Sequence, residues 1–317
     1  MKVPKTLDEI YFSYLTYRKK SGLKNSPVIT LKQFWLDCKK FSNHEYLTKE
    51  MVDAWIAKRP TETPFSNYTR STPIINFLKY ANGRGWLDFD VPKVKSVTHR
   101  GSIPHAFTQE ELTNFFNACD EIKSSRSLVS KLKRIEVPVF FRLLYSSGMR
   151  TLEARWLRNN DVDLKNGIIY IRHSKGYGEH IVVLHDNMLE LMRCYDKTVS
   201  RLIPDRLYFF PSQYKDKCHW SSWVQDMFHE MWFKYNTATS VVPYQLRHHY
   251  AITNINRWSD GYDIHEYLVA LSKSMGHRTL ESTLYYYSLV PRLKNQIEEM
   301  DGKRLNHIIP DLPDEEE

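Results

Sequence analysis

Four short segments hold side chains that could act together on a phosphate group. In chain order they are SSGMRTLEARWL at 146–157, HSKGYGEH at 173–180, YQLRHHYA at 244–251 and MGHRTLESTLYYYSL at 275–289. Arg150 and Arg247, in the first and third segments, could each give a phosphate a fixed charge and two parallel hydrogen bonds. Lys175 lies on a glycine-rich turn, where an ammonium group can transfer a proton. These residue types suit a reaction at a phosphate.

Each of these segments also has a plainer interpretation. Arg150 could be a surface arginine paired with Glu153. Lys175 could be a solvated lysine of a hairpin turn, and Arg247 with His248 could make local hydrogen bonds at a helix start. No segment therefore predicts a catalytic site alone.

The last segment adds His277 and three consecutive tyrosines at 285–287. A tyrosine hydroxyl can act as a nucleophile that forms a covalent intermediate. Tyr286 follows His277 by nine residues, or about two and a half turns of continuous helix. The chain must therefore bend or break between them if both are to meet at one phosphate. A run of aromatic residues is usually core, although one of the three tyrosines could be exposed.

In their joint order and spacing, the four segments resemble the tyrosine recombinases, also called phage integrases. The pattern of that family is an arginine after an apolar helix and a glycine, then a hairpin lysine, H-x-x-R, Gly-His and a tyrosine. This sequence matches it with Arg150, Lys175, Arg247, Gly276, His277 and Tyr286, and with Glu153 at the acidic position. The resemblance covers residues 106–300, and the spacing from Gly-His selects Tyr286 over its two neighbours.

One position departs from the family pattern. The histidine of H-x-x-R is Tyr244 in this chain. A phenol can donate a hydrogen bond to a phosphate oxygen, but it cannot carry a positive charge. We include Tyr244 among the predicted site residues and leave open whether it replaces the histidine functionally.

The resemblance implies a site-specific recombinase or integrase that cuts and rejoins DNA strands. Tyr286 would attack a backbone phosphate, form a 3′-phosphotyrosine and release a 5′-hydroxyl. Arg150 and Arg247 would stabilise the charge on the phosphate, His277 would donate a further hydrogen bond and Lys175 would protonate the leaving oxygen. The reaction implies no cofactor and no metal.

The implied partner is double-stranded DNA, on which the chain would assemble as a homo-oligomer, a tetramer. A role in a phage, a transposon or the chromosome stays open. Two alternatives remain: a type IB topoisomerase-like enzyme, which shares the chemistry, and a non-catalytic DNA-binding accessory protein on the same fold. Relaxation of plasmid DNA without a specific site would favour the topoisomerase.

The elements that must position these residues predict a mainly α fold with a small β-sheet. Residues 1–90 are predicted to form a helical core-binding domain, followed by a basic linker at 91–105, a catalytic domain at 106–303 and an acidic tail at 304–317. In the first domain, helices are expected from Leu7 behind Thr6, and over 31–41, 49–58 and 68–82.

The catalytic domain is expected to open with a helix that Thr108 and Glu111 begin as a capping box. A second apolar helix over 137–145 should end at Gly148. Strands are predicted at 168–172 and 181–184, with helical patterns dominating from there to about residue 303.

Bulk composition agrees with this organisation. The chain of 317 residues suits two domains, and its net charge is +8, with 18 basic and 9 acidic residues in the first 100. Such a basic portion favours a polyanionic partner. Its four scattered cysteines indicate neither zinc nor disulfides, and the lack of a signal peptide or membrane span predicts a cytoplasmic protein.

Overall fold

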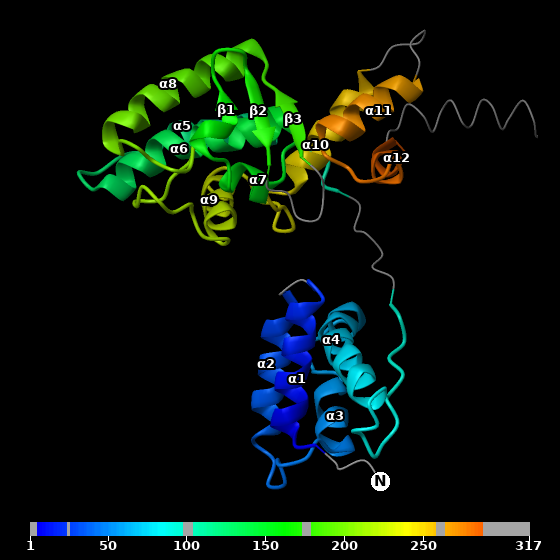
Figure 1. Cartoon of the computed structure of the whole chain (residues 1–317). Helices are drawn as coiled ribbons and strands as arrows, with labels where there is room; N and C mark the ends of the chain where they lie inside the picture. The colour runs from blue at the N-terminus through cyan, green and yellow to red at the C-terminus, as the bar shows by residue number, and fades with distance from the viewer. Residues whose placement is uncertain (1–4, 24–25, 98–103, 173–178, 258–263, 288–317) are drawn as a thin grey trace, which may run out of the picture. The chain divides into compact units, whose positions relative to one another are not determined.

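The chain divides into two compact units, Met1–Ser102 and Ile103–Glu317, each with its own hydrophobic core. The computed structural model describes residues 5–23, 26–97, 104–172, 179–257 and 264–287. Helices predominate there, with a small sheet in the second unit, so the predicted fold class is confirmed (Figure 1). No helix in these ranges is long and apolar enough to cross a membrane.

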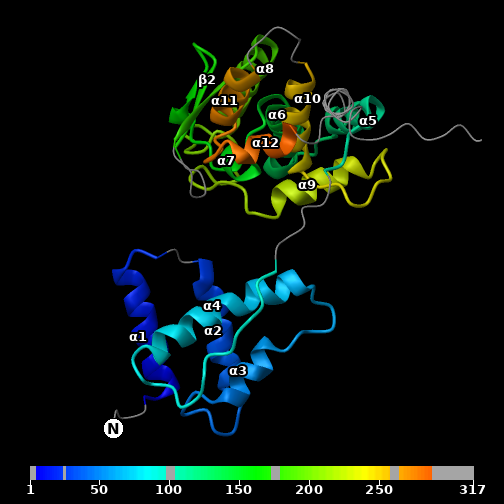
Figure 2. The ribbon, with the colours of Figure 1, turned by 90° about the vertical axis from the view of Figure 1, so that its right-hand side faces the viewer.

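The first unit is a bundle of helices around an aromatic core. Its helices are α1 (Leu7–Lys20), α2 (Ser26–Cys38), α3 (Lys49–Ile56) and α4 (Pro64–Asn82). α4 contacts the other three (Figures 1 and 2). Its Phe77 is buried between Tyr14 of α1 and Phe34 of α2, with ring centroids 5.4 and 6.1 Å away. This burial removes a large apolar area from water and holds the bundle together.

The starts of two helices confirm their predicted caps, and two others do not match. Thr6 caps α1 in a capping box and Thr48 caps α3. The starts predicted for the other two helices were wrong, because α2 begins at Ser26 and α4 at Pro64. A proline in the first turn costs no helical hydrogen bond, and the Thr63 hydroxyl accepts one from the Ser66 amide at 3.1 Å.

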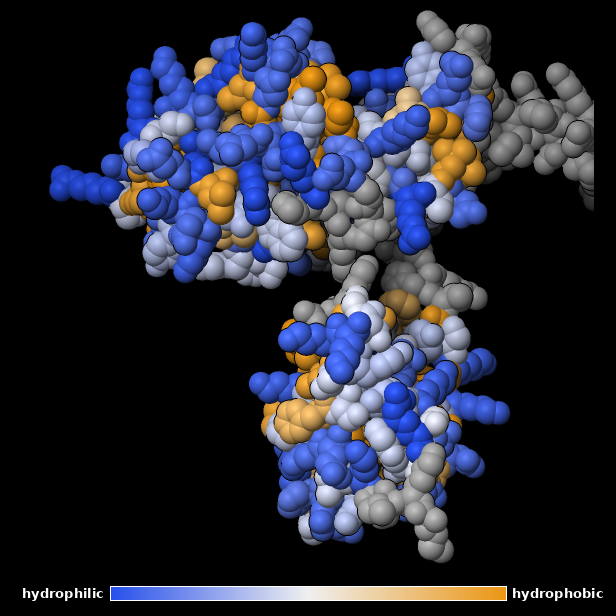
Figure 3. Space-filling view, in the orientation of Figure 1, coloured by the Kyte–Doolittle hydropathy of each residue, from blue (hydrophilic) through white to orange (hydrophobic). Residues whose placement is uncertain are grey.

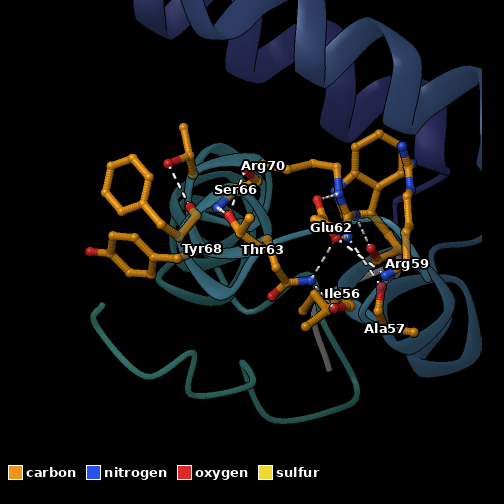
Figure 4. Close-up of polar contacts among 12 residues, drawn as sticks. Ile56, Ala57, Arg59, Glu62, Thr63, Ser66, Tyr68 and Arg70 are labelled. Carbon is orange, nitrogen blue, oxygen red and sulfur yellow. Dashed lines mark hydrogen bonds and ion pairs between the residues drawn. The ribbon is translucent and has the colours of Figure 1, made fainter. Parts of the chain in front are cut away.

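The connection between α3 and α4 is fixed by an ion pair between Arg70 and Glu62 (Figure 4). Arg70 Nε and Nη2 donate to the two carboxylate oxygens of Glu62 at 2.7 and 2.8 Å. The same guanidinium also donates to the carbonyls of Trp55 and Ala57 at the end of α3. The hydrogen bond from Arg70 lowers the pKa of Glu62 to about 2. These charged hydrogen bonds therefore hold the connection between α3 and α4 in place, although it forms no helix or strand.

The second unit packs helices against a three-stranded antiparallel sheet of order β1-β2-β3. Before and within the sheet, the elements are α5 (Gln109–Asp120), α6 (Leu128–Ser147), α7 (Thr151–Arg155), the 3-10 helix η1 (Asn159–Asp161), β1 (Val162–Asp163), β2 (Ile168–Ile171) and β3 (His180–Val183). The helices that follow in the described residues are α8 (Asp186–Leu202), α9 (Trp223–Trp232), α10 (Gln245–Asn256), α11 (Ile264–Ser274) and α12 (Glu281–Tyr287). The register places Ile171 of β2 opposite His180 of β3.

α6 is the central helix of this unit and contacts α5, α7, α8 and α10. It starts at Leu128, earlier than predicted, because the Ser127 hydroxyl caps it. It ends at Gly148, as predicted, with φ of +63°. A Cβ at Gly148 would lie 2.3 Å from the Tyr250 ring, so both the conformation and the packing require glycine. This turn places Arg150 directly before α7.

The surface is mostly polar in the view of Figure 3. Hydrophobic side chains appear there in separate patches over both units. Among described residues, Ile29 and Val183 are the most exposed large hydrophobic side chains, at 80% and 75%. Scattered apolar residues of this kind are ordinary on a folded protein.

Candidate functional site

Four elements bring most of the predicted site residues into one region of the second unit. Arg150 caps α7, Tyr244 and Arg247 lie at the start of α10, His277 follows α11, and Tyr286 lies near the end of α12. α10 contacts α6 and α12, and α11 also contacts α12. Lys175 falls outside the described residues.

Both arginines bind the same turn of the chain. Arg150 Nη2 donates to the Gly276 carbonyl at 2.9 Å, and Arg247 Nη2 donates to the Met275 carbonyl at 2.8 Å. Arg247 Nη1 donates to the Gly148 carbonyl at 2.6 Å. The Met275–Gly276 turn therefore holds the two guanidinium groups together, although they come from segments far apart in the sequence.

Glu153 fixes the orientation of Arg150. One carboxylate oxygen accepts from Arg150 Nη1 at 2.6 Å and the other from the Arg150 amide at 2.9 Å. The Glu153 side chain is fully buried and that of Arg150 is 14% exposed. The pairing expected of a surface arginine does form, but it is buried and it aims the guanidinium at the Gly276 turn.

His277 and Tyr286 stack on each other. Their ring centroids lie 5.9 Å apart, with 11° between the planes. The predicted break between them exists, since α12 begins only at Glu281. Tyr286 is 4% exposed, whereas its neighbour Tyr285 is 41% exposed. Of these two tyrosines, Tyr286 is thus the one that is buried against His277 and close to Arg247.

The electrostatics of the site keep both stacked rings neutral near pH 7. Burial, followed by the charges of Arg247 and Arg150, lowers the pKa of His277 to about 4. Burial raises the pKa of Tyr286 to about 12, and Tyr244 adds to this rise while Arg247 opposes it. His277 is therefore a hydrogen-bonding group here, and Tyr286 must lose a proton to act as a nucleophile.

Tyr244 borders the site rather than lying inside it. Its side chain is 42% exposed, and its ring packs edge-on against His248 with centroids 4.9 Å apart. His248 in turn lies 5.4 Å from the Tyr286 ring. Burial, followed by the charge of Arg150, lowers the pKa of Arg247, and Tyr244 opposes this change as it adds to the rise in the pKa of Tyr286.

Two side chains of this region were not predicted from the sequence. The buried Thr283 hydroxyl is hydrogen-bonded to His277 Nδ1 at 2.7 Å, which fixes the orientation of the imidazole. Its position in the first turn of α12 was the available signal. His180 lies against Gly276 from the β3 strand, a contact that no local pattern signals.

An open hollow lies beside His277. Its lining includes the basic residues Lys273 and Arg278 together with Glu179, and it adjoins His180 and Gly276. Two exposed cations at its border suit an anionic ligand. In the described residues, no three His, Cys, Asp or Glu side chains are grouped so that they could hold a metal ion.

Comparison with known proteins places this site in a family. Residues 105–291 match the model of the phage integrase family. The tyrosine recombinase XerA of Thermococcus kodakarensis is 25% identical over 210 residues, which are 63% of this chain and 64% of that protein. The tyrosine recombinase XerC of Lactobacillus delbrueckii subsp. bulgaricus is 22% identical over 297 residues, 89% of this chain and 93% of that protein. The chain thus spans less than two thirds of the XerA length.

A solved structure shares the fold. The crystal structure of the XerH site-specific recombinase bound to its palindromic difH substrate aligns with a TM-score of 0.62 and 16% sequence identity, over 92% of this chain and 94% of that one. Such low identity speaks for the fold alone. The family model covers more than half of the chain and contains every described residue of the site. The chain belongs to the phage integrase family of tyrosine recombinases.

Proposed function

We propose that this chain is a site-specific DNA recombinase or integrase that cuts and rejoins strands through a covalent bond to Tyr286. The observation that supports this best is the meeting of Arg150, Arg247, His277 and Tyr286 around one turn. Two guanidinium groups, a neutral imidazole and a buried phenol suit nucleophilic attack on a phosphodiester.

In the proposed reaction, the Tyr286 hydroxyl loses its proton to water as its oxygen attacks the phosphorus, and the bond to the 5′-oxygen breaks. Arg150 and Arg247 stabilise the charge on the non-bridging oxygens, and His277 adds a hydrogen bond. Lys175, assigned from the family pattern, gives its proton to the leaving 5′-oxygen. Attack of a 5′-hydroxyl on the phosphotyrosine then reforms a phosphodiester and releases Tyr286.

The proposed partner is double-stranded DNA, on which copies of the chain assemble as a tetramer. The net charge of +8 and the DNA complex of the structurally similar XerH support DNA as the partner. We assign DNA binding to residues 1–90, catalysis to 106–303 and the roles of basic linker and acidic tail to 91–105 and 304–317. The similarity to a transposon integrase, with a TM-score of 0.60 and 15% identity, supports a mobile element as the setting.

The test uses the DNA that flanks the gene of this chain. The purified protein is incubated with that DNA and the products are sequenced across their junctions. A recombinase gives recombinant junctions at one site, whereas a topoisomerase-like enzyme relaxes plasmid DNA at many sites. No strand exchange, relaxation or covalent adduct would leave a DNA-binding accessory role and contradict the proposal.

A further inference from the structure

His180 is a buried residue that lies between two parts of the site without belonging to its predicted set. It opens β3, and its side chain is 8% exposed. Gly276 has φ of +62°, and a Cβ there would lie 2.5 Å from Cε1, 2.7 Å from Nδ1 and 3.0 Å from Nε2 of the ring. The imidazole therefore packs directly on the glycine backbone, a space that no other residue type leaves open.

The same ring also lies near the carboxylate that orients Arg150. His180 Nε2 lies 4.0 Å from Glu153 Oε2, and Glu153 holds Arg150 at 2.6 Å. Gly276, under the ring, supplies the carbonyl to which Arg150 Nη2 donates. His180 thus touches both groups that hold the Arg150 guanidinium, and one of them directly precedes His277.

We infer that His180 is a positioning residue for the phosphate at which the strand is cut. It sets the separation between the Glu153–Arg150 pair and the Gly276–His277 turn, so that the guanidinium and the imidazole meet one phosphate. This role rests on the proposed function. It differs from a purely structural role because it acts through the interaction of Arg150 with phosphate charge.

A substrate without that charge separates the two roles. In a methylphosphonate linkage, a methyl group replaces one non-bridging oxygen and the linkage is neutral. A neutral linkage has little need for a well-placed guanidinium, because less charge develops on it. Substitution of a residue that acts through Arg150 should therefore slow cleavage of a phosphodiester much more than cleavage of a methylphosphonate.

The experiment measures covalent adduct formation in a single turnover, with both substrates, for wild type, His180→Ala and His180→Gln. The control is His185→Gln, an exposed histidine at the start of α8 that should leave both rates unchanged. We expect His180→Ala to slow cleavage of the phosphodiester about 10- to 100-fold. With the methylphosphonate, the same substitution should slow cleavage by less than about threefold. His180→Gln should restore part of the rate with the phosphodiester, because glutamine keeps a polar group near Glu153.

Equal losses of His180→Ala on both substrates would show a structural role and overturn the inference. Wild-type rates on both substrates would overturn it as well. The loss of the adduct in wild type itself is a different result, since it contradicts the proposed function and the positioning role together. Thermal unfolding of each variant shows whether a rate loss accompanies unfolding.

Discussion

The His277 imidazole and the Tyr286 phenol lie parallel, 5.9 Å apart, at the junction between the turn after α11 and the helix α12. This stacking joins the turn that binds both arginines to the helix that carries the proposed nucleophile. The break at residues 275–280 makes it possible, because a continuous helix would place the two rings on different faces. Changes that disturb the ring of His277 should therefore reach Tyr286.

Thr283 is the side chain that holds this ring. Thr283→Val keeps the shape of the side chain and removes the 2.7 Å hydrogen bond to His277 Nδ1. We expect the cleavage rate to fall about 10- to 100-fold, since groups that orient a reacting side chain have effects of this size. The matched control is Thr279→Val, at an exposed position in the segment between α11 and α12. A Thr283→Val variant as fast as this control would contradict an orienting role.

Variants of Tyr244 test whether this tyrosine takes the role of the family histidine at the phosphate. Tyr244→Phe removes one neutral hydrogen-bond donor at the border of the site, and we expect cleavage to slow roughly fivefold, in line with about 1 kcal/mol for such a bond. Tyr244→His keeps a donor and should retain at least the wild-type rate. The measurement is single-turnover cleavage at fixed DNA concentration. If both variants cut at the wild-type rate, Tyr244 has no role at the phosphate.

Gly276 and Gly22 form a matched pair for the packing of the turn. Both have φ of +62°, so alanine brings about 1 kcal/mol of backbone strain at either position. A Cβ at Gly22 meets nothing within 4 Å, whereas one at Gly276 meets the His180 ring at 2.5 Å. Gly276→Ala should therefore lower the free energy of unfolding of the second unit by about 1–3 kcal/mol more than Gly22→Ala lowers that of the first unit. It should also slow cleavage.

Gly22→Ala should leave cleavage unchanged, because its methyl group displaces no neighbour. Denaturant unfolding of the full chain, followed separately in the two units, gives both free energies. Equal destabilisation by the two substitutions would mean that His180 yields to the methyl group without cost.

Glu62 makes the stability of the first unit depend on pH. Its pKa is about 2 in the folded chain, below the ordinary value of 4.5, so the unfolded chain binds more protons between these values. The stabilisation by its ion pair with Arg70 is complete above about pH 4.5 and is lost as the pH falls towards 2. Glu62→Gln should lower the free energy of unfolding of the first unit by about 2 kcal/mol at pH 7 and by much less at pH 2.

The control for this prediction is Glu45→Gln, an exposed carboxylate of the same unit. Unfolding of the first unit in the full chain is measured at pH 7 and as the pH is lowered. A Glu62→Gln variant whose loss of stability does not depend on pH would contradict the assignment of this carboxylate to the acid-sensitive ion pair.

The sequence predicted the site residues through the order of short segments, because each segment carries its own local signal. Gly148 and the capping box at Thr108 marked helix ends that the structure shows. The sequence could not predict that Arg150 and Arg247 bind adjacent carbonyls, since this contact depends on how α7, α10 and the turn after α11 pack. Local patterns carry no information on such distant pairings.

The errors at α2 and β1 have local causes. The start of α2 was predicted at residue 31, but the helix begins at Ser26, and Pro27 lies in its first turn, where a proline fits. β1 was missed because two residues, Val162–Asp163, are too short to show an alternating pattern. His180 was missed for a third reason: its partners Glu153 and Gly276 come from other segments, so only the tertiary structure shows what it contacts.

The central claim is that Tyr286 becomes joined to DNA. The direct measurement is the covalent adduct formed with a nicked suicide substrate, in which the cut strand is lost and rejoining is prevented. Wild type and Tyr285→Phe, changed at the exposed neighbour, should both form an adduct whose peptide carries the phosphate on Tyr286. Tyr286→Phe should form none, because phenylalanine has no nucleophilic oxygen. An adduct that persists in Tyr286→Phe, or that maps to Tyr285, would contradict the account.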